Sequence, residues 1–296
     1  MQIKTTIQAT RPSFLILTPI CIFLGLSSAL ANECKIELSV FFLVLMGATF
    51  AHVSVNTLNE YDDFKSGLDL KTDKTAFSGG SGALPENPDM AKSVYILGLV
   101  SLLVTITIGL YLIIKYGIQI LPFGVVGVML IISYTQWLNR FPLLCLLAPG
   151  LGFGVLMVVG THVILNGHHS LLPWLLSLIP FFLINNLLLL NQYPDIKADA
   201  SVGRNTFPIA FGLKKSNAVY AIFMLATYSL LLFYIFEGYV PKLSIIALFP
   251  MAFSMFALIG AMKHTSNIGA FPQYMAANVA ASIFTPFLLG ISIIYG

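Results

Sequence analysis

The sequence predicts an all-α integral membrane protein, a bundle of nine transmembrane helices around a central cavity that opens to the cytosolic face. Of its 296 residues, 57% are hydrophobic and only 9% are charged, and the mean hydropathy is +0.89. A soluble domain is typically about one quarter charged, so these values exclude an ordinary cytosolic enzyme and a disordered protein alike. Nucleic-acid binding is also excluded, because Lys and Arg form no basic face.

Nine segments are long and apolar enough to cross the hydrocarbon core, which takes roughly 20 residues of helix. We treat residues 1–296 as a single domain. The expected spans are about 13–31, 37–58, 91–114, 118–138, 142–165, 171–190, 217–236, 240–262 and 273–295.

The first span has an alternative interpretation as a signal peptide, since Ala29-Leu30-Ala31 resembles a cleavage site after an apolar run. The run is nevertheless long enough to span, and Arg11-Pro12 suits a helix start. We therefore expect a transmembrane helix here. The three cysteines, Cys21, Cys34 and Cys145, form no C-x-x-C pair, and we expect them to be packing residues.

Lys and Arg predict the orientation, because cytoplasmic loops carry an excess of both. With the N-terminus inside, twelve of the fifteen lie on the cytoplasmic side, and only Lys35, Lys115 and Lys242 lie outside. Nine spans then place the C-terminus outside. We expect a protein of the cell (inner) membrane with a cytoplasmic N-terminus.

The carboxylates are concentrated in two places. Seven of the twelve lie between residues 60 and 89, after the second span, and Asp195 and Asp199 follow the sixth span. Both spans are even-numbered, so both acidic clusters emerge on the face that is rich in Lys and Arg. A chain with so little charge has therefore gathered both signs on one side of the membrane.

Each acidic cluster contains the pattern Asn-x-x-x-Asp, at Asn59–Asp63 and at Asn191–Asp195. Residues four apart lie on one face of a helix. If the sixth span continues, Asn191, Asp195 and Asp199 form one stripe, although Pro194 can kink it. Upstream of Asp63, polar residues share its face at helical spacing, which indicates a stripe lining a protein cavity; they are His52, Asn56 and Asn59.

Two facing sets of oxygen ligands beside basic residues suit Mg²⁺ carrying a phosphate-rich ligand. Mg²⁺ prefers octahedral oxygen coordination, with one or two carboxylates completed by phosphate and water. Lys and Arg can neutralise the remaining negative charge of a diphosphate. The alternative is a secondary transporter, in which these acids are solvated loop charges; coupling acids in transporters, however, usually lie near the bilayer midplane.

These residues resemble the UbiA superfamily of membrane prenyltransferases over nearly the whole chain. The first family motif, of the type Asn-Asp-x-x-Asp-x-x-x-Asp, matches at Asn59, Asp63 and Asp69, in the longer-spaced form with Gly67. The second, Asp-x-x-x-Asp, matches at Asp195 and Asp199 and is followed by Gly203-Arg204-Asn205-Thr206. The stretch from Phe77 to Gly82 is similar to the branch that includes 1,4-dihydroxy-2-naphthoate prenyltransferase, of the menaquinone pathway.

Two positions depart from the family pattern. Glu60 stands where Asp is usual, which is a conservative change for an oxygen ligand or for a residue that supports such a ligand. Lys74 stands where many relatives carry Arg, which loses a bidentate phosphate contact but keeps the charge.

The resemblance implies Mg²⁺-dependent transfer of a polyprenyl group from its diphosphate to an aromatic acceptor. The acceptor expected from the branch is 1,4-dihydroxy-2-naphthoate, and 4-hydroxybenzoate, homogentisate, a haem precursor or a chlorophyll precursor are alternatives. It implies metal binding by Asp63, Asp69, Asp195 and Asp199. The catalytic residues are then Asn59, Asp63, Asp195 and Tyr134, and the diphosphate-binding residues are Lys65, Lys74, Arg140, Lys197 and Arg204. The oligomeric state is left open.

Other polar residues have competing interpretations. His162 is ionisable within a span and thus a functional candidate, but we favour a neutral histidine hydrogen-bonded to a neighbouring helix. His168 and His169 are expected in a loop on the opposite face from the acids. The Ser78–Gly82 stretch either cradles phosphate through backbone N–H groups or forms a flexible lid.

Overall fold

The computed structural model describes residues 2–32, 35–75 and 77–296, and every regular element within these ranges is helical. Cys34 lies outside the described residues. The longer elements are α1 (Gln2–Ala9), α3 (Leu17–Leu30), α4 (Leu38–Lys65), α6 (Ala91–Tyr116), α7 (Leu121–Gln136), α8 (Pro142–Gly150), α9 (Val158–Asn166), α10 (Leu171–Asn191), α12 (Phe207–Phe236), α13 (Met251–His264) and α14 (Pro272–Tyr295).

Short elements connect these helices. They are α2 (Pro12–Leu15), α5 (Ala83–Glu86), α11 (Ile196–Ser201), the 3₁₀ segments η1 (Pro88–Met90), η2 (Ile118–Ile120), η3 (Leu138–Arg140), η5 (Lys242–Leu248) and η6 (Thr265–Ala270), and the π-helical η4 (Leu151–Met157) between α8 and α9.

Eight helical stretches in the described part of the chain are long and apolar enough to cross a membrane. They correspond to eight of the nine expected spans. The remaining one, expected at 118–138, is a shorter apolar helix, Ile118–Tyr134, so the count of nine spans stays a prediction. Proline occupies the first turn of several helices, where its missing N–H costs nothing; these are Pro12, Pro142, Pro208 and Pro272.

Two helix boundaries differ from the expected ones in ways that matter for the site. The second span was expected to end near residue 58, but α4 continues to Lys65 and carries the first acidic motif on its last turns. The seventh was expected to begin near 217. In the structure the helical stretch begins at Phe207, and Gly212, with φ 79°, kinks it just before the expected start.

Helix α10 lies at the centre of the bundle and packs against α8, η4, α12 and α14. Glycines permit the close approach of the α8–η4 segment, since a Cβ on Gly150 or Gly154 would lie within 2.6 Å of the backbone of Phe181 on α10. Asn185 of α10 accepts a hydrogen bond from the backbone N–H of Gly150 at 2.6 Å. This contact lies where the α-helix gives way to the π-helical turn.

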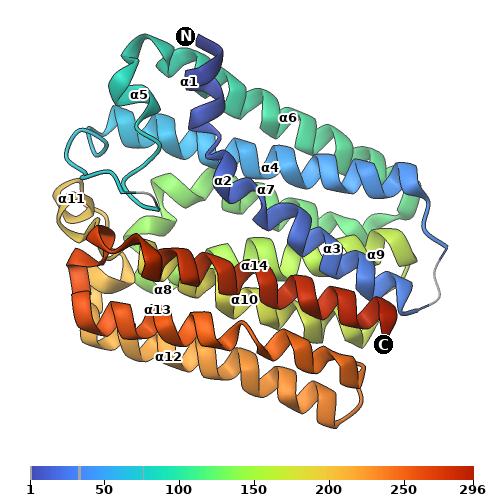
Figure 1. The fold of residues 1–296 in the computed structure, drawn as a ribbon. Helices are drawn as coiled ribbons and strands as arrows, with labels where there is room; N and C mark the ends of the chain where they lie inside the picture. Colours follow the sequence, from blue (N-terminus) through green and yellow to red (C-terminus); the bar gives the residue numbers. More distant parts are fainter. Residues whose placement is uncertain (1, 33–34, 76) are drawn as a thin grey trace.

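The long helices run roughly side by side between two ends of the molecule (Figure 1). The segment after α4, with α5 and α11, lies at one end, on the left of the view, and the C-terminus lies at the other. Helix α1 contacts α5 and α6, which places the N-terminal segment at the same end as the acidic motifs. The loop that contains His168 and His169 joins α9 to α10.

Candidate functional site

The first acidic motif lies on the last turns of α4. Because the helix continues past residue 58, Asn59 and Asp63 are one turn apart, and Asn59 Nδ2 donates to Asp63 Oδ2 at 2.8 Å. His52, Asn56 and Asn59 line the same cavity as Asp63, which confirms the polar stripe expected on this helix. Asp69 follows in the connecting loop and also lines the cavity.

The second acidic motif lies on the short helix α11. Asp195 occupies the N-cap position, and the N–H of Asp199 donates to the carbonyl of Asp195 at 2.8 Å, so both side chains share one helical turn. The sixth span does not continue through the motif, because α10 ends at Asn191 and a turn containing Pro194 intervenes, so Asn191, Asp195 and Asp199 do not form one continuous helical stripe. All three residues nevertheless line the cavity.

Arg204 joins the two motifs. Its guanidinium donates to Asp199 Oδ1 at 3.0 Å and to Asp63 Oδ1, although Asp63 and Arg204 are 141 positions apart in the chain. The side chains of Asp63 and Asp199 are 6% and 5% exposed, and that of Arg204 is 17% exposed. Two nearly buried carboxylates therefore share one cation at the point where the motifs meet.

The glycine-rich segment 77–82 crosses between the motifs. At one side, the N–H of Gly79 donates to Asp195 Oδ2 at 3.1 Å. At the other, Ser81 donates to Glu60 through its backbone N–H (3.2 Å) and through its hydroxyl. A Cβ on Gly80 would lie 2.7 Å from Asp69 Oδ1, so the segment passes directly over that carboxylate.

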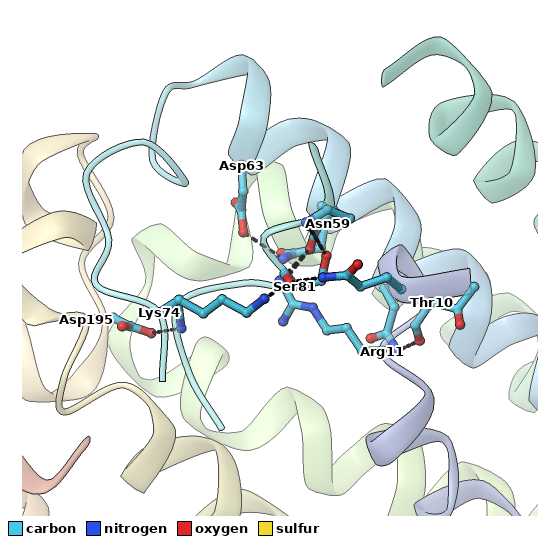
Figure 2. Close-up of polar contacts among 12 residues, drawn as sticks. Thr10, Arg11, Asn59, Asp63, Lys74, Ser81 and Asp195 are labelled. Atoms are coloured by element: carbon cyan, nitrogen blue, oxygen red, sulfur yellow. Dashed lines mark hydrogen bonds and ion pairs between the residues drawn. The ribbon is translucent and has the colours of Figure 1, made fainter. Parts of the chain in front are cut away.

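Glu60 is fully buried and holds this segment against the N-terminal residues. In addition to the bonds from Ser81, it accepts one from Arg11 at 3.2 Å. Arg11 has a left-handed backbone conformation (φ 51°), which separates α1 from α2. Lys74 donates to the carbonyl oxygen of Ser81, and Figure 2 shows Arg11 and Lys74 approaching Ser81 from different segments, with Asp195 on the far side of Lys74.

The acids line one end of a cavity of about 690 Å³, and we call this end, which lies beside the loops after α4 and α10, the cavity mouth. Its polar end contains Asp63, Asp69, Asp195, Asp199 and Arg204. From there the lining becomes apolar, with side chains from α4, α6, α7 and the α8–α9 segment. Its deep end includes Val44, Leu112, Ile120, Phe123 and Ile164.

Burial makes two acids outside the helical spans, Asp69 and Asp195, weaker than usual, because it raises the pKa of each. Loss of hydration raises the pKa of Asp69 to about 7, and the nearby charges of Glu60 and Asp63 add to this effect. Loss of hydration likewise raises the pKa of Asp195 to about 7, with a further contribution from Asp199. A cation placed between these carboxylates would stabilise their charged forms.

The donor set fits Mg²⁺ held together with a phosphate ligand. One oxygen of Asp69 (Oδ2) and one of Asp195 (Oδ1) are buried and have no hydrogen-bond partner among the described residues. No group of three His, Cys, Asp or Glu side chains within that part of the chain is arranged to hold a metal ion alone. Mg²⁺ characteristically takes only one or two carboxylates and completes its shell with phosphate and water, so both observations agree with it.

The structure places the remaining predicted site residues at different distances from this centre. Tyr134, on α7, lines the cavity. Among the five cations predicted to bind diphosphate, Arg204 lines the cavity, whereas Lys65, Lys74, Arg140 and Lys197 are exposed outside its lining. Their role in binding diphosphate stays a prediction.

His162 has the environment expected for a structural histidine. It is fully buried, and its two ring nitrogens lie 2.9 Å from the hydroxyl of Ser28 on α3 and 3.0 Å from that of Ser170. Cys21 and Cys145 are buried free thiols, but Cys145 also lines the cavity.

Sequence reasoning missed several cavity-lining polar residues. Arg11 could have been found from its position next to the helix-starting Pro12 and from the acidic residues that it would have to neutralise. Gln192 and Thr206 also line the cavity. Gln192 lies next to Asn191, and Thr206 ends the Gly203–Thr206 stretch that follows the second motif, but the pattern assigned neither residue a role in the site.

Comparisons with known proteins agree with this arrangement. The profile of the UbiA prenyltransferase family matches residues 18–280. A 1,4-dihydroxy-2-naphthoate octaprenyltransferase of Bacillus subtilis (strain 168) is 28% identical over 217 residues, which are 70% of this chain and 66% of that protein, just under two thirds of its length. A UbiA prenyltransferase domain-containing protein 1 of Dictyostelium discoideum is 28% identical over 75% of this chain and 68% of that protein.

The fold is shared with solved structures of low sequence identity. A UbiA homolog from Archaeoglobus fulgidus bound to DMAPP and Mg²⁺ aligns with a TM-score of 0.69 at 13% identity, covering 98% of this chain and 99% of that one. A UbiA homolog from Aeropyrum pernix K1, in its apo form, aligns with a TM-score of 0.70 at 17% identity, covering 96% and 98%.

Proposed function

Because this chain belongs to the UbiA prenyltransferase family, we propose that it transfers a polyprenyl group from polyprenyl diphosphate to an aromatic acceptor in quinone biosynthesis, with Mg²⁺ as cofactor. The observation that carries the proposal is the meeting of the two acidic motifs across Arg204, at the mouth of one largely apolar cavity. A diphosphate at the mouth and a prenyl chain in the apolar part match the two chemical halves of such a substrate.

The acidic end provides the diphosphate site. Asp63, Asp69, Asp195 and Asp199 would hold Mg²⁺, which when bound supplies positive charge that neutralises the departing diphosphate. Arg204 already lies between Asp63 and Asp199, within the same site. Its guanidinium donates hydrogen bonds in a fork that suits phosphate oxygens, and it would stabilise the negative charge that develops there.

The apolar part of the cavity protects the reacting carbon. An allylic centre that loses diphosphate carries positive charge and is quenched by water, so a lining of Leu, Ile, Val and Phe side chains favours transfer over hydrolysis. Tyr134 also lines the cavity, and there its ring would face the developing cation. Asn59 orients Asp63 through its amide, which is the role we propose for it.

The acceptor that we propose is 1,4-dihydroxy-2-naphthoate. Its support is the name of the Bacillus subtilis relative and the glycine-rich stretch from Phe77 to Gly82. Acceptors of the 4-hydroxybenzoate, homogentisate, haem-precursor and chlorophyll-precursor type are the alternatives within the family. A secondary transporter is disfavoured, since the acids lie at helix ends rather than near the middle of a span.

We further propose that the site and the N-terminus face the cytoplasm and that the C-terminus lies outside, in the cell (inner) membrane. The support is the excess of Lys and Arg at the acidic end together with the position of the two termini at opposite ends of the bundle (Figure 1).

The test is a transfer assay with the purified protein, a radiolabelled polyprenyl diphosphate and a panel of aromatic acceptors, with products identified by mass spectrometry. We expect a prenylated product that requires Mg²⁺ and disappears with EDTA. A wild-type protein that prenylates no acceptor, while liposomes containing it accumulate a solute, would reverse the ranking in favour of transport.

A further inference from the structure

Two polar side chains on one wall of the cavity mouth, Thr206 and Gln192, each have a buried oxygen atom with no assigned role. Thr206 is only 2% exposed and lines the cavity, and its hydroxyl has no hydrogen-bond partner among the described residues. Thr206 precedes α12 at the N-cap position, where a threonine ordinarily bonds a free N–H of its helix. Its side chain makes no such bond.

Gln192 presents the second unpaired group. Its Nε2 donates to the Sγ of Cys145 at 3.5 Å, while its Oε1 is buried and unpaired within the described ranges. Buried polar atoms are almost always paired, and a buried atom that is not calls for a ligand or an ordered water. Both groups line the same cavity as the acidic motifs.

The packing behind these side chains brings them to one wall. Phe207, Leu146 and Tyr193 belong to one buried apolar cluster. They are the immediate chain neighbours of Thr206, Cys145 and Gln192, respectively, which line the cavity in front of that cluster. The N–H of Asn205 donates to the carbonyl of Asn139 at 2.8 Å and fixes the start of α12 to the α7–α8 connection.

Taking the proposed prenyl transfer as its premise, we propose that Thr206 and Gln192 bind the phenolic hydroxyl groups of the aromatic acceptor, at a subsite formed by α8, the end of α10 and the start of α12.

The chemistry of this wall selects such a ligand. A phenolic hydroxyl can donate to Gln192 Oε1, which only accepts, and can exchange a hydrogen bond with the hydroxyl of Thr206. Neither side chain is charged, so this wall would not attract the diphosphate away from the proposed Mg²⁺ site and Arg204. Because Thr206 is two residues from Arg204, a ring held here lies beside the diphosphate site rather than deep among the apolar side chains.

The test measures KM separately for 1,4-dihydroxy-2-naphthoate and for the prenyl diphosphate. Thr206→Val removes the hydroxyl and keeps the shape, and Gln192→Met removes the amide. One lost hydrogen bond predicts a rise of roughly 3- to 10-fold in the acceptor KM, with an unchanged KM for the diphosphate. Thr206→Ser, which keeps a hydroxyl, should restore the wild-type value.

The matched control is Thr227→Val, on the same helix. Thr227 is fully buried, but its hydroxyl bonds the carbonyl of Phe223 within α12, and it does not line the cavity. We expect it to leave both KM values unchanged. Competition by 1-hydroxy-2-naphthoate, which lacks one hydroxyl, gives a second readout. In the variant that has lost the partner of this missing hydroxyl, the ratio of the affinities for the monohydroxy and dihydroxy compounds should approach 1.

Three results would overturn the inference: an unchanged acceptor KM in both variants, an equal rise in both KM values, or an affinity ratio that neither variant alters. If Thr206→Val does not fold, Gln192→Met decides alone. A wild-type protein that prenylates no aromatic acceptor contradicts the proposed function itself, whereas a fully active wild type with insensitive variants contradicts only this subsite.

Discussion

Glu60 belongs to the first acidic motif in sequence, but its contacts predict a positioning role and no contact with metal. Its carboxylate is fully buried, does not line the cavity, and accepts hydrogen bonds from Ser81 and Arg11. It thus ties α4, the glycine-rich segment and the N-terminal residues together. Substitution should therefore destabilise the protein without altering its demand for Mg²⁺.

The magnitude follows from the ion pair. Removing one partner of a buried pair costs about 3–5 kcal/mol, and the 27% exposure of the Arg11 side chain favours the lower end for Glu60→Ala. At about 2–4 °C per kcal/mol, the melting temperature should fall by about 6–12 °C. Glu60→Gln keeps an acceptor oxygen for Ser81 and should lose less.

The assay pairs melting temperature in detergent with the Mg²⁺ concentration that gives half-maximal transfer. Asp195→Asn is the contrasting variant: because burial already raises the pKa of Asp195 to about 7, a neutral amide should cost little stability but should raise the Mg²⁺ requirement. The reasoning is refuted if Glu60→Gln raises the Mg²⁺ requirement as Asp195→Asn does while the melting temperature is unchanged.

Three further predictions concern the mouth of the cavity. The raised pKa values of Asp69 and Asp195, about 7 for each, mean that these carboxylates are protonated below that pH and must lose the proton to bind metal. The Mg²⁺ requirement in a pH titration should therefore rise at least roughly 5-fold between about pH 7 and about pH 6, and a flat profile would contradict it. Arg204→Ala leaves the two carboxylates that it bridges without their shared cation, so the melting temperature should fall and Mg²⁺ should restore more of it than in the wild type; equal responses would argue against the bridge. Gly80→Ala and Gly67→Ala each place alanine at a left-handed position (φ 73° and 74°), which costs about 1–2 kcal/mol of strain. Only the Gly80 variant would push a Cβ against Asp69. At a matched loss of stability, only the Gly80 variant should therefore abolish transfer.

Hydropathy was sufficient to predict most of the helices, but not where they end. The apolar signal of the second span fades near residue 58, whereas α4 continues to Lys65 because its polar residues face a cavity and neighbouring segments. A hydropathy window cannot separate such a helix end from a loop. At the second motif the helix ends earlier than the sequence pattern suggests. The spacing of Asn191, Asp195 and Asp199 suits one continuous helix, but the turn at Pro194 separates α10 from α11.

The candidate site was predictable in its acids and less so in its cations. Each of the four predicted metal-binding aspartates lines the cavity, because local spacing reveals a motif. Arg204 reaches Asp63 from 141 positions away in the chain, and Arg11 reaches Glu60 from 49 positions away. Long-range pairs of this kind depend on how helices pack, and a single sequence does not show which cation meets which carboxylate.

The central claim is that both acidic motifs bind one diphosphate together through Mg²⁺. Calorimetric titration of the purified protein with geranyl diphosphate, with and without Mg²⁺, tests it directly in the wild type, Asp63→Ala and Asp195→Ala. The account predicts one Mg²⁺-dependent binding event per chain in the wild type and its loss in each variant alone. Wild-type affinity in either variant, or two independent binding events, would contradict it.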